Sequence, residues 1–164
     1  MSQSLTLTPV LLDNAKANDA TPGAAAGATV KLNLSDPDST NVVPAESPAY
    51  AGQFAVVAQG DRALIFIDKL GTAGQVNTAL PIGDEVNDLV FATSATGTLY
   101  VTDTSTDKIY AITGNFKPGT AFVAAPNDSG TAGFLATVDL KSGIITPIVG
   151  GMGSPHGILF VPQP

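Results

Sequence analysis

Apolar residues in this chain fall into short runs, separated by segments rich in Gly, Asp, Asn, Ser and Thr. Runs of this length with turn residues between them are typical of β-strands joined by tight turns. No window has an apolar stripe at the 3.6-residue spacing of an amphipathic helix, so we expect an all-β chain with antiparallel neighbours. From residue 52 onward the predicted strands are 54–58, 63–68, 76–82, 86–93, 98–102, 108–113, 120–125, 134–140, 144–149 and 156–161.

One phrase occurs twice, 45 residues apart, at residues 52–56 (GQFAV) and 97–101 (GTLYV). The match continues downstream, where Leu64 corresponds to Ile109 and Phe66 to Ala111. A repeat of about 40–45 residues made of short strands has the size of one β-propeller blade. The repeat therefore predicts antiparallel propeller-like blades, about three of them in this chain.

A second correspondence has an offset of 69 residues and relates 86–91 (VNDLVF) to 155–160 (PHGILF). A third hairpin, at 122–125 and 134–140, is half a repeat out of step with the first two. Two arrangements satisfy this spacing. Either the second blade lacks its outer strand and residues 115–119 bypass it, or the third hairpin completes that blade.

Residues 1–49 differ from the repeat region at 50–164 and form an N-terminal extension of loops with two short strands, expected at 5–12 and 29–34. Residues 35–40 (SDPDST) have the composition of a turn. The repeat positions predict a buried set. Its members are Phe54, Val56, Leu64, Phe66, Leu89, Phe91, Leu99, Val101, Ile109, Phe122, Phe134, Leu135, Ile158 and Phe160.

Composition narrows the function classes. The net charge is -7, from 7 basic and 14 acidic residues, and no cluster of Lys or Arg occurs, which argues against nucleic acid and anionic membrane surfaces as partners. The absence of cysteine excludes disulfides and thiol chemistry, and a single histidine excludes a multi-histidine metal site. No signal peptide is visible in this chain, although its composition is of a kind common in exported bacterial proteins.

Residues 87–92 (NDLVFA), 97–103 (GTLYVTD) and 108–112 (KIYAI) together resemble one blade of the NHL / SMP-30-like β-propellers. Residues 154–161 (SPHGILFV) resemble the first strand of another blade, and the resemblance covers residues 52–164. It implies a partial propeller, because such rings usually have about six blades. Enzymes and pure binding modules share these motifs, so the resemblance implies fold more than function.

The alignment at offset 69 places Asn87 and His156 at the start of two inner strands, near the central channel where propellers bind ligands. With Asp88, they are the channel-lining candidates for ligand binding. His156 could line the channel as a polar side chain. It could equally lie in a turn before the strand, with its ring hydrogen-bonded to the backbone. Ser154 lies two residues away on the same strand, about 6–7 Å, which is too far for a nucleophile and its base.

Asp84 and Glu85, next to Asn87 and Asp88, form the densest group of carboxylates and amides. The resemblance to SMP-30-like lactonases implies oxygen ligands for calcium here, whereas the spacing fits equally a solvated turn between blades. The other ligands of those enzymes have no match in this chain, and no further cofactor is expected.

These observations favour a non-catalytic β-propeller-type binding or scaffold protein, which could be the C-terminal part of a longer exported protein. The alternative is a lactonase-like or lyase-like propeller enzyme whose site forms only in a complete ring. Three blades leave open ends, and a homodimer would close both. Residues 1–49 folding back over one end is the other solution, and a small ligand or a protein is the expected partner.

Overall fold

The computed structural model describes residues 5–25, 27–128, 130 and 132–163, and these residues contain thirteen β-strands and no helix. The all-β prediction is confirmed, and each strand expected after residue 52 is present. Among the described residues there is accordingly no helix that could cross a membrane. The strands are β1 (Lys16–Asp19), β2 (Thr29–Lys31), β3 (Pro37–Val42), β4 (Phe54–Ala58), β5 (Ala63–Asp68), β6 (Val76–Pro81), β7 (Asp88–Phe91), β8 (Thr96–Asp103), β9 (Lys108–Asn115), β10 (Ala121–Ala125), β11 (Gly133–Val138), β12 (Ile145–Met152) and β13 (Pro155–Pro162).

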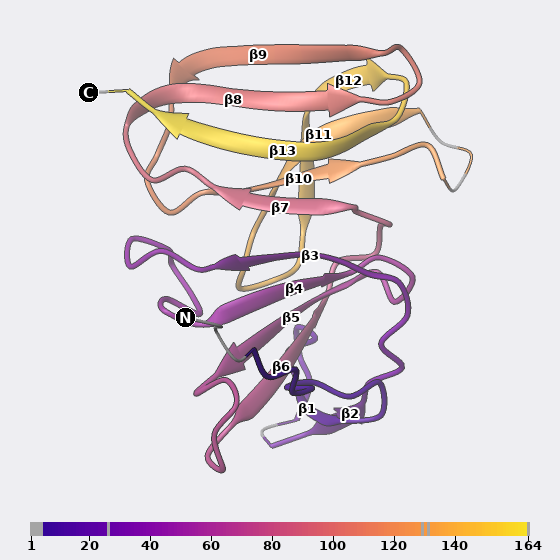
Figure 1. Cartoon of the computed structure of the whole chain (residues 1–164), viewed down its shortest axis with the longest axis vertical. Helices are drawn as coiled ribbons and strands as arrows, with labels where there is room; N and C mark the ends of the chain where they lie inside the picture. Colours follow the sequence, from indigo (N-terminus) through magenta and orange to yellow (C-terminus); the bar gives the residue numbers. More distant parts are fainter. Residues whose placement is uncertain (1–4, 26, 129, 131, 164) are drawn as a thin grey trace.

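The strands form three sheets that lie one above another (Figure 1). Sheet A has six strands in the order β2-β1-β6-β5-β4-β3, sheet B has four in the order β12-β11-β10-β7, and sheet C has three in the order β13-β8-β9. Neighbouring strands are antiparallel except β1 and β6, which are parallel. Within the described part of the chain no sheet closes on itself.

Sheets B and C are interleaved along the chain. β7 pairs with β10, and the β8–β9 hairpin that lies between them in sequence pairs instead with β13. The hairpin β10–β11 therefore completes the sheet that β7 begins, but neither of the two expected arrangements is found, because β8 and β9, expected in one blade with β7, lie in a different sheet.

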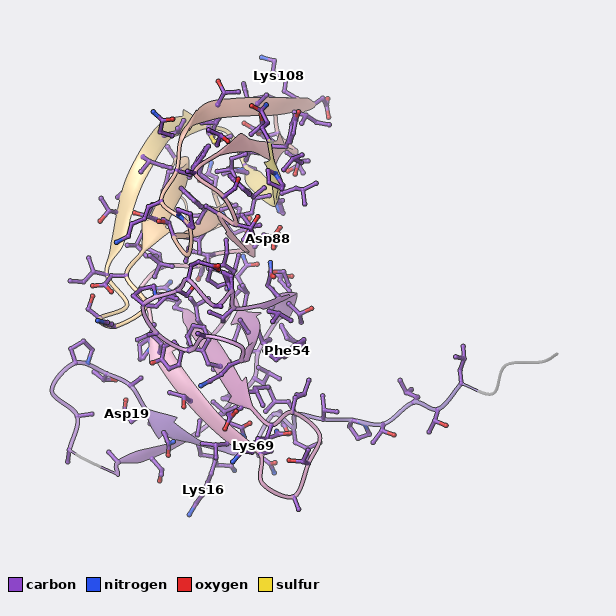
Figure 2. The ribbon with its side chains drawn as sticks, turned by 90° about the vertical axis from the view of Figure 1, so that its left-hand side faces the viewer. Lys16, Asp19, Phe54, Lys69, Asp88 and Lys108 are labelled. Carbon is purple, nitrogen blue, oxygen red and sulfur yellow. The ribbon has the colours of Figure 1, made fainter. Side chains whose placement is uncertain are left out.

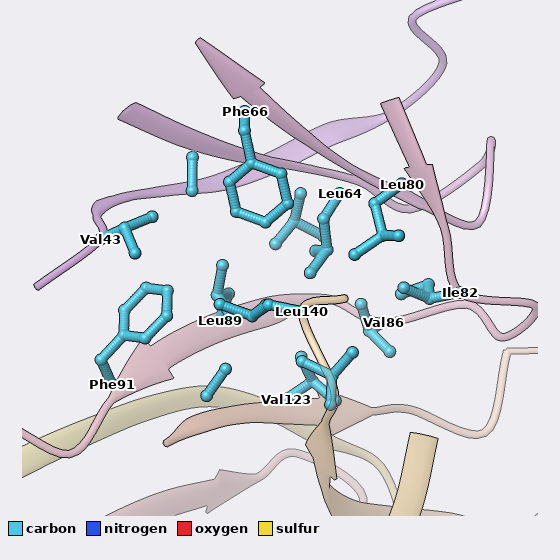
Figure 3. Packing of buried hydrophobic residues seen from close by; sticks show 14 of the residues in the cluster. Val43, Leu64, Phe66, Leu80, Ile82, Val86, Leu89, Phe91, Val123 and Leu140 are labelled. Atoms are coloured by element: carbon cyan, nitrogen blue, oxygen red, sulfur yellow. The ribbon is translucent and has the colours of Figure 1, made fainter. Parts of the chain in front are cut away.

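The core lies in two layers between the sheets. Alternate residues of β5 face opposite sides of sheet A, so that Leu64 and Phe66 point toward sheet B while Ile65 and Ile67 point away from it. In Figure 3, Leu64 and Phe66 face the layer that contains Val123 of β10, with Leu89 and Leu140 between them. A second cluster, which includes Leu99, Val101, Leu135 and Phe160, fills the space between sheets B and C. Burial on both faces explains why β5 is a continuous apolar run.

The two ends of the stack differ. The outer face of sheet A, with Ile65 and Ile67, packs against residues from the segment 11–34, including Ala17 and Leu32. The outer face of sheet C, by contrast, leaves large apolar side chains exposed. These side chains are Tyr100, Ile109, Leu159 and Val161. The extension thus covers one end of the stack, and the described residues leave the other end open.

The extension differs from the prediction in several places, since β1 lies at Lys16–Asp19, where only a loop is expected, and the strand expected at 29–34 ends at Lys31. Residues 5–12 do not form a strand, and Leu5 and Leu7 are exposed. Residues 37–40, expected as part of a turn, belong to β3 (Pro37–Val42), because Asp36 takes the left-handed conformation (φ 50°) and the chain after it pairs with β4. Strands from both sides of residue 49 join in sheet A.

The burial prediction holds for most of the repeat positions, with Phe54 and Phe134 only half-buried. It is wrong for Ile109, which is 71% exposed although its repeat partner Leu64 is fully buried. Ile109 pairs with Thr102 on the outer face of sheet C, on the edge strand β9. The corresponding strand β5 lies inside sheet A with layers on both sides, so the same local sequence position has a different environment.

Candidate ligand-binding site at the start of β3, β7 and β13

Three edge strands, one from each sheet, lie side by side: β7 packs against both β3 and β13. Figure 1 shows all three arrows pointing the same way, so their first residues lie at one edge of the molecule. We call this edge the rim and define it by Asp38, Gln59, Asn87, Asp88, Asp128 and His156. Asn87 directly precedes β7 and His156 is the second residue of β13, so the two occupy similar places on neighbouring strands.

Asn87 is the centre of a hydrogen-bond network that joins sheets A and B at the rim. Its side-chain Nδ2 donates to Asp38 Oδ2 at 2.9 Å and to Gln59 Oε1 at 3.1 Å. Gln59 is buried, and its Nε2 donates to Asp128 Oδ2 at 2.7 Å. The backbone N–H of Asn87 donates to the carbonyl of Ala124 at 2.8 Å, which fixes the residue to β10.

The carboxyl of Asp38 has an altered acidity because of its neighbours. Loss of solvent around the group and the negative charges of Asp36 and Asp128 raise its pKa, whereas the charge of His156 and the hydrogen bond from Asn87 act in the opposite direction. Carboxylates from two parts of the chain thus share the rim with the one histidine. Their mutual repulsion favours a proton or another cation at this place.

Asp88 connects sheets B and C. Its Oδ1 accepts from the backbone N–H of Leu89 and its Oδ2 from the backbone N–H of Ile158, each at 2.8 Å. His156 Nδ1 lies 3.0 Å from the carbonyl oxygen of Ser154, 3.2 Å from Thr104 Oγ1 and 3.5 Å from Ser154 Oγ, so the separation of 6–7 Å expected for Ser154 and His156 is wrong. Both residues therefore have partners within the fold, and the rim is a place where side chains hold three sheets together.

The other carboxylates singled out in the sequence point elsewhere. Glu85 Oε1 pairs with Arg62 Nη2 at 3.0 Å, and Asp84 is exposed in the turn before β7. The described residues include no group of three or more His, Asp or Glu placed to hold a metal ion. Asp84 and Glu85 are thus not brought together with Asn87 and Asp88 as one ligand set.

Sequence reasoning missed several residues that organise this region. Asp38 was assigned to turn chemistry, and Gln59 and Asp128 carry no local signal. Asp103 ends the motif at 97–103, and its side chain is buried.

Asp103 anchors the loop before β13. Its carboxylate accepts hydrogen bonds from the backbone N–H groups of Gly153 (2.8 Å) and Ser154 (2.9 Å) and from Ser105 Oγ (3.1 Å). Burial by itself would raise the pKa of Asp103, but these donors together lower it to about 2. The residue is therefore an anion at neutral pH that fixes where β13 begins.

A shallow hollow of about 410 Å³ lies on the outer face of sheet C, next to the rim. Its lining is mostly apolar, from Tyr100, Ile109, Ile158 and Leu159, with Asp88 at its border. The candidate site thus combines a polar rim with an adjacent apolar face. An arrangement of this kind can bind a partner by apolar contact and orient it by a few polar groups.

Comparison with known proteins adds no assignment to this geometry: no family model, no curated protein and no solved structure matches the chain.

Proposed function

We propose that the chain is a non-catalytic binding or scaffold protein built from propeller-type blades, and that the outer face of sheet C is its docking surface. The observation that carries the proposal is the difference between the two ends of the stack. The chain covers the outer face of sheet A with its own residues 11–34, and it leaves Tyr100, Ile109 and Leu159 exposed at the other end. Adjacent exposed apolar side chains on one face are typical of interaction sites.

The propeller-type reading draws support from the three neighbouring edge strands β3, β7 and β13. In a propeller each blade contributes one inner strand to a common axis, and further blades stack on both outer faces. In a partial ring, the sheet at the end would expose the face on which the next blade would stack. The binding role draws support from the rim, where the polar side chains are paired with one another and hold the sheets in register.

The docking surface can be tested with a fluorescent dye that binds apolar protein surfaces. We expect the double variant Ile109→Thr, Leu159→Thr to lose most of the dye binding of the unmodified chain, with its thermal unfolding unchanged. Ile144→Thr, Ile148→Thr is the matched control, because both side chains are exposed but lie outside the hollow. Equal loss of dye binding in both double variants would refute the assignment to sheet C.

A lactonase-like or lyase-like enzyme is the second candidate, and the carboxylates of the rim favour it. Asp36 and Asp128 are each close enough to Asp38 to raise its pKa, and the amide oxygen of Gln59 accepts from the same Asn87 amide as Asp38. Oxygen atoms of these kinds are the ligands that calcium prefers.

Calorimetric titration of the full chain with calcium separates this candidate from the first. A saturable heat of calcium binding that Asp38→Asn abolishes would favour the enzyme, with calcium as its metal. No heat up to about 1 mM calcium, the weak end of the range for protein sites, would count against it.

A further inference from the structure

The N-terminal segment at residues 5–10, called the arm here, is exposed, carries no charge and pairs with no sheet. Leu5 is 90% and Leu7 100% exposed, and each alternates with a threonine. Figure 2 shows this segment leaving the body as an extended chain. Leu11, by contrast, already packs against the outer face of sheet A. Alternation over residues 5–8 fits a short strand with both leucines on one face, and Pro9 would end its pairing.

Sheet C has an open edge that could accept such a strand. Its edge strand β9 has eight residues, contains no proline and carries one charge, on Lys108. Nearly all of its residues are exposed. An edge of this length and composition is a ready template for another strand, because half of its backbone groups face outward. Sheet B has four strands where sheet C has three.

Beside this edge lies an apolar hollow of about 240 Å³ between β9 and β12. Tyr110 and Ile112 line it from β9, and Val149 and Met152 line it from β12, with no charged residue among the lining groups. A Cβ atom added at Gly150, also in the lining, would meet nothing within 4 Å. The hollow therefore has room for side chains that come from outside the body.

We infer that residues 5–8 of one copy of this chain add to β9 of a second copy as the fourth strand of its sheet C, with Leu5 and Leu7 in the hollow beside β12. The inference goes beyond the proposed function, because the acceptor is the edge of β9 and the hollow beside β12, and not the outer face of sheet C.

The arm and its acceptor suit contact between two chains that repel each other. Each copy has a net charge of -7, but residues 5–12 contain no charged residue and the hollow none either. The two surfaces therefore meet where electrostatic repulsion is weakest.

The strand must come from a second copy, because the arm is too short to reach β9 of its own copy. The arm departs from the outer side of sheet A, and sheet C lies two sheet spacings away, about 20 Å. Six residues span at most about 20 Å when fully extended, which leaves none to pair with β9 of the same copy. Two copies side by side in opposite directions could exchange arms reciprocally, which gives a closed pair related by a two-fold axis.

The test is the solution mass of the full chain, measured by light scattering between about 1 and about 100 µM, the range in which a small interface of this kind associates. The expected result is a rise from the 16.5 kDa chain mass toward twice that value. Leu5→Ser, Leu7→Ser removes the leucines of the arm, and Gly150→Leu fills the hollow. Both variants should weaken association by about tenfold or more.

Each variant has a matched control. Val76→Ser removes an exposed apolar side chain from β6, and Gly74→Leu adds a side chain at a loop position with only ordinary contacts, so both should associate like the unmodified chain. In a second arm of the experiment, a labelled peptide of residues 5–12 should bind the full-length Leu5→Ser, Leu7→Ser variant. The same peptide with serine at both leucine positions should not bind.

Two results would overturn the inference. A monomer at every concentration would exclude association through the arm. Association unaffected by Leu5→Ser, Leu7→Ser would place the contact elsewhere, such as between the outer faces of two C sheets. In either case loss of dye binding in the Ile109→Thr, Leu159→Thr variant would leave the proposed docking surface standing.

Discussion

The Nδ2 atom of Asn87 lies 2.9 Å from Asp38 Oδ2, so the residue that precedes β7 in sheet B is tied directly to β3 in sheet A. Because the same amide also donates to Gln59, replacing Asn87 by Leu removes two hydrogen bonds and leaves a carboxylate without this donor. We expect Asn87→Leu to lower the free energy of unfolding by about 1–3 kcal/mol, measured by urea denaturation. Asn33→Leu, at an exposed position after β2, is the control, and a loss as large there would contradict the role of the network.

Asp103 should make the stability of the protein sensitive to acid. Its pKa of about 2 in the folded chain is below the ordinary value of 3.8, because four hydrogen bonds from Gly153, Ser154 and Ser105 outweigh the effect of burial. A lowered folded pKa means that the stabilisation is fully present above about pH 4 and is lost as the pH falls toward 2.

Asp103→Asn keeps the shape but cannot accept the same set of bonds, so we expect a loss of about 1.5–3 kcal/mol at pH 7. Urea denaturation of both proteins at several pH values would show the difference shrinking between about pH 4 and about pH 2. A difference that stays constant over that interval would mean that the Asp103 charge is not its source.

The repeat partners Leu64 and Ile109 should respond very differently to truncation. Leu64 is fully buried between sheets A and B, so Leu64→Ala should cost about 2–5 kcal/mol. Ile109 is 71% exposed, and Ile109→Ala should change the stability by less than about 0.5 kcal/mol. Thermal or urea denaturation compares the two directly, and a similar loss in both would mean that sheet C is covered in the isolated chain.

Gly143 occupies a backbone conformation and a space that exclude other residues. Its φ is +73°, and a Cβ atom there would lie 2.1 Å from the carbonyl oxygen of Pro81. Gly143→Ala should therefore cost more than about 2 kcal/mol. Gly83 has a similar φ of +80° but open space around it, so Gly83→Ala should cost only the backbone strain of about 1–2 kcal/mol. Equal shifts of the melting temperature would show that the contact with Pro81 yields without cost.

The strands could be predicted from sequence because alternation and turn residues are local properties, as β5 and β10 illustrate. The exposure of Ile109 could not, since its repeat position says nothing of whether another sheet lies above it. β3 could not be predicted either, because Pro37 and Asp38 are residues typical of turns. The strand forms because this segment pairs with β4 in the folded chain.

The candidate site was predictable only where it depends on local sequence properties. Matching 86–91 with 155–160 was sufficient to place Asn87 and His156 near the start of β7 and β13. The partner of Asn87 is 49 residues away in Asp38, and Asp128 joins through Gln59. Such contacts depend on how the sheets stack, and a single sequence carries no signal for them.

The interleaving of sheets B and C also constrains how the chain can be made and altered. β8 emerges early, but its partner β13 is the last strand, with paired residues such as Thr102 and Gly157 lying 55 positions apart. A two-stranded hairpin is only marginally stable in water, so β8–β9 must wait until β13 has been synthesised before its sheet is complete. Pairings of such long range slow folding. Deleting or duplicating the repeat that begins at Gly97 would disturb both sheet B and sheet C, because β8 and β9 belong to one and β10 and β11 to the other.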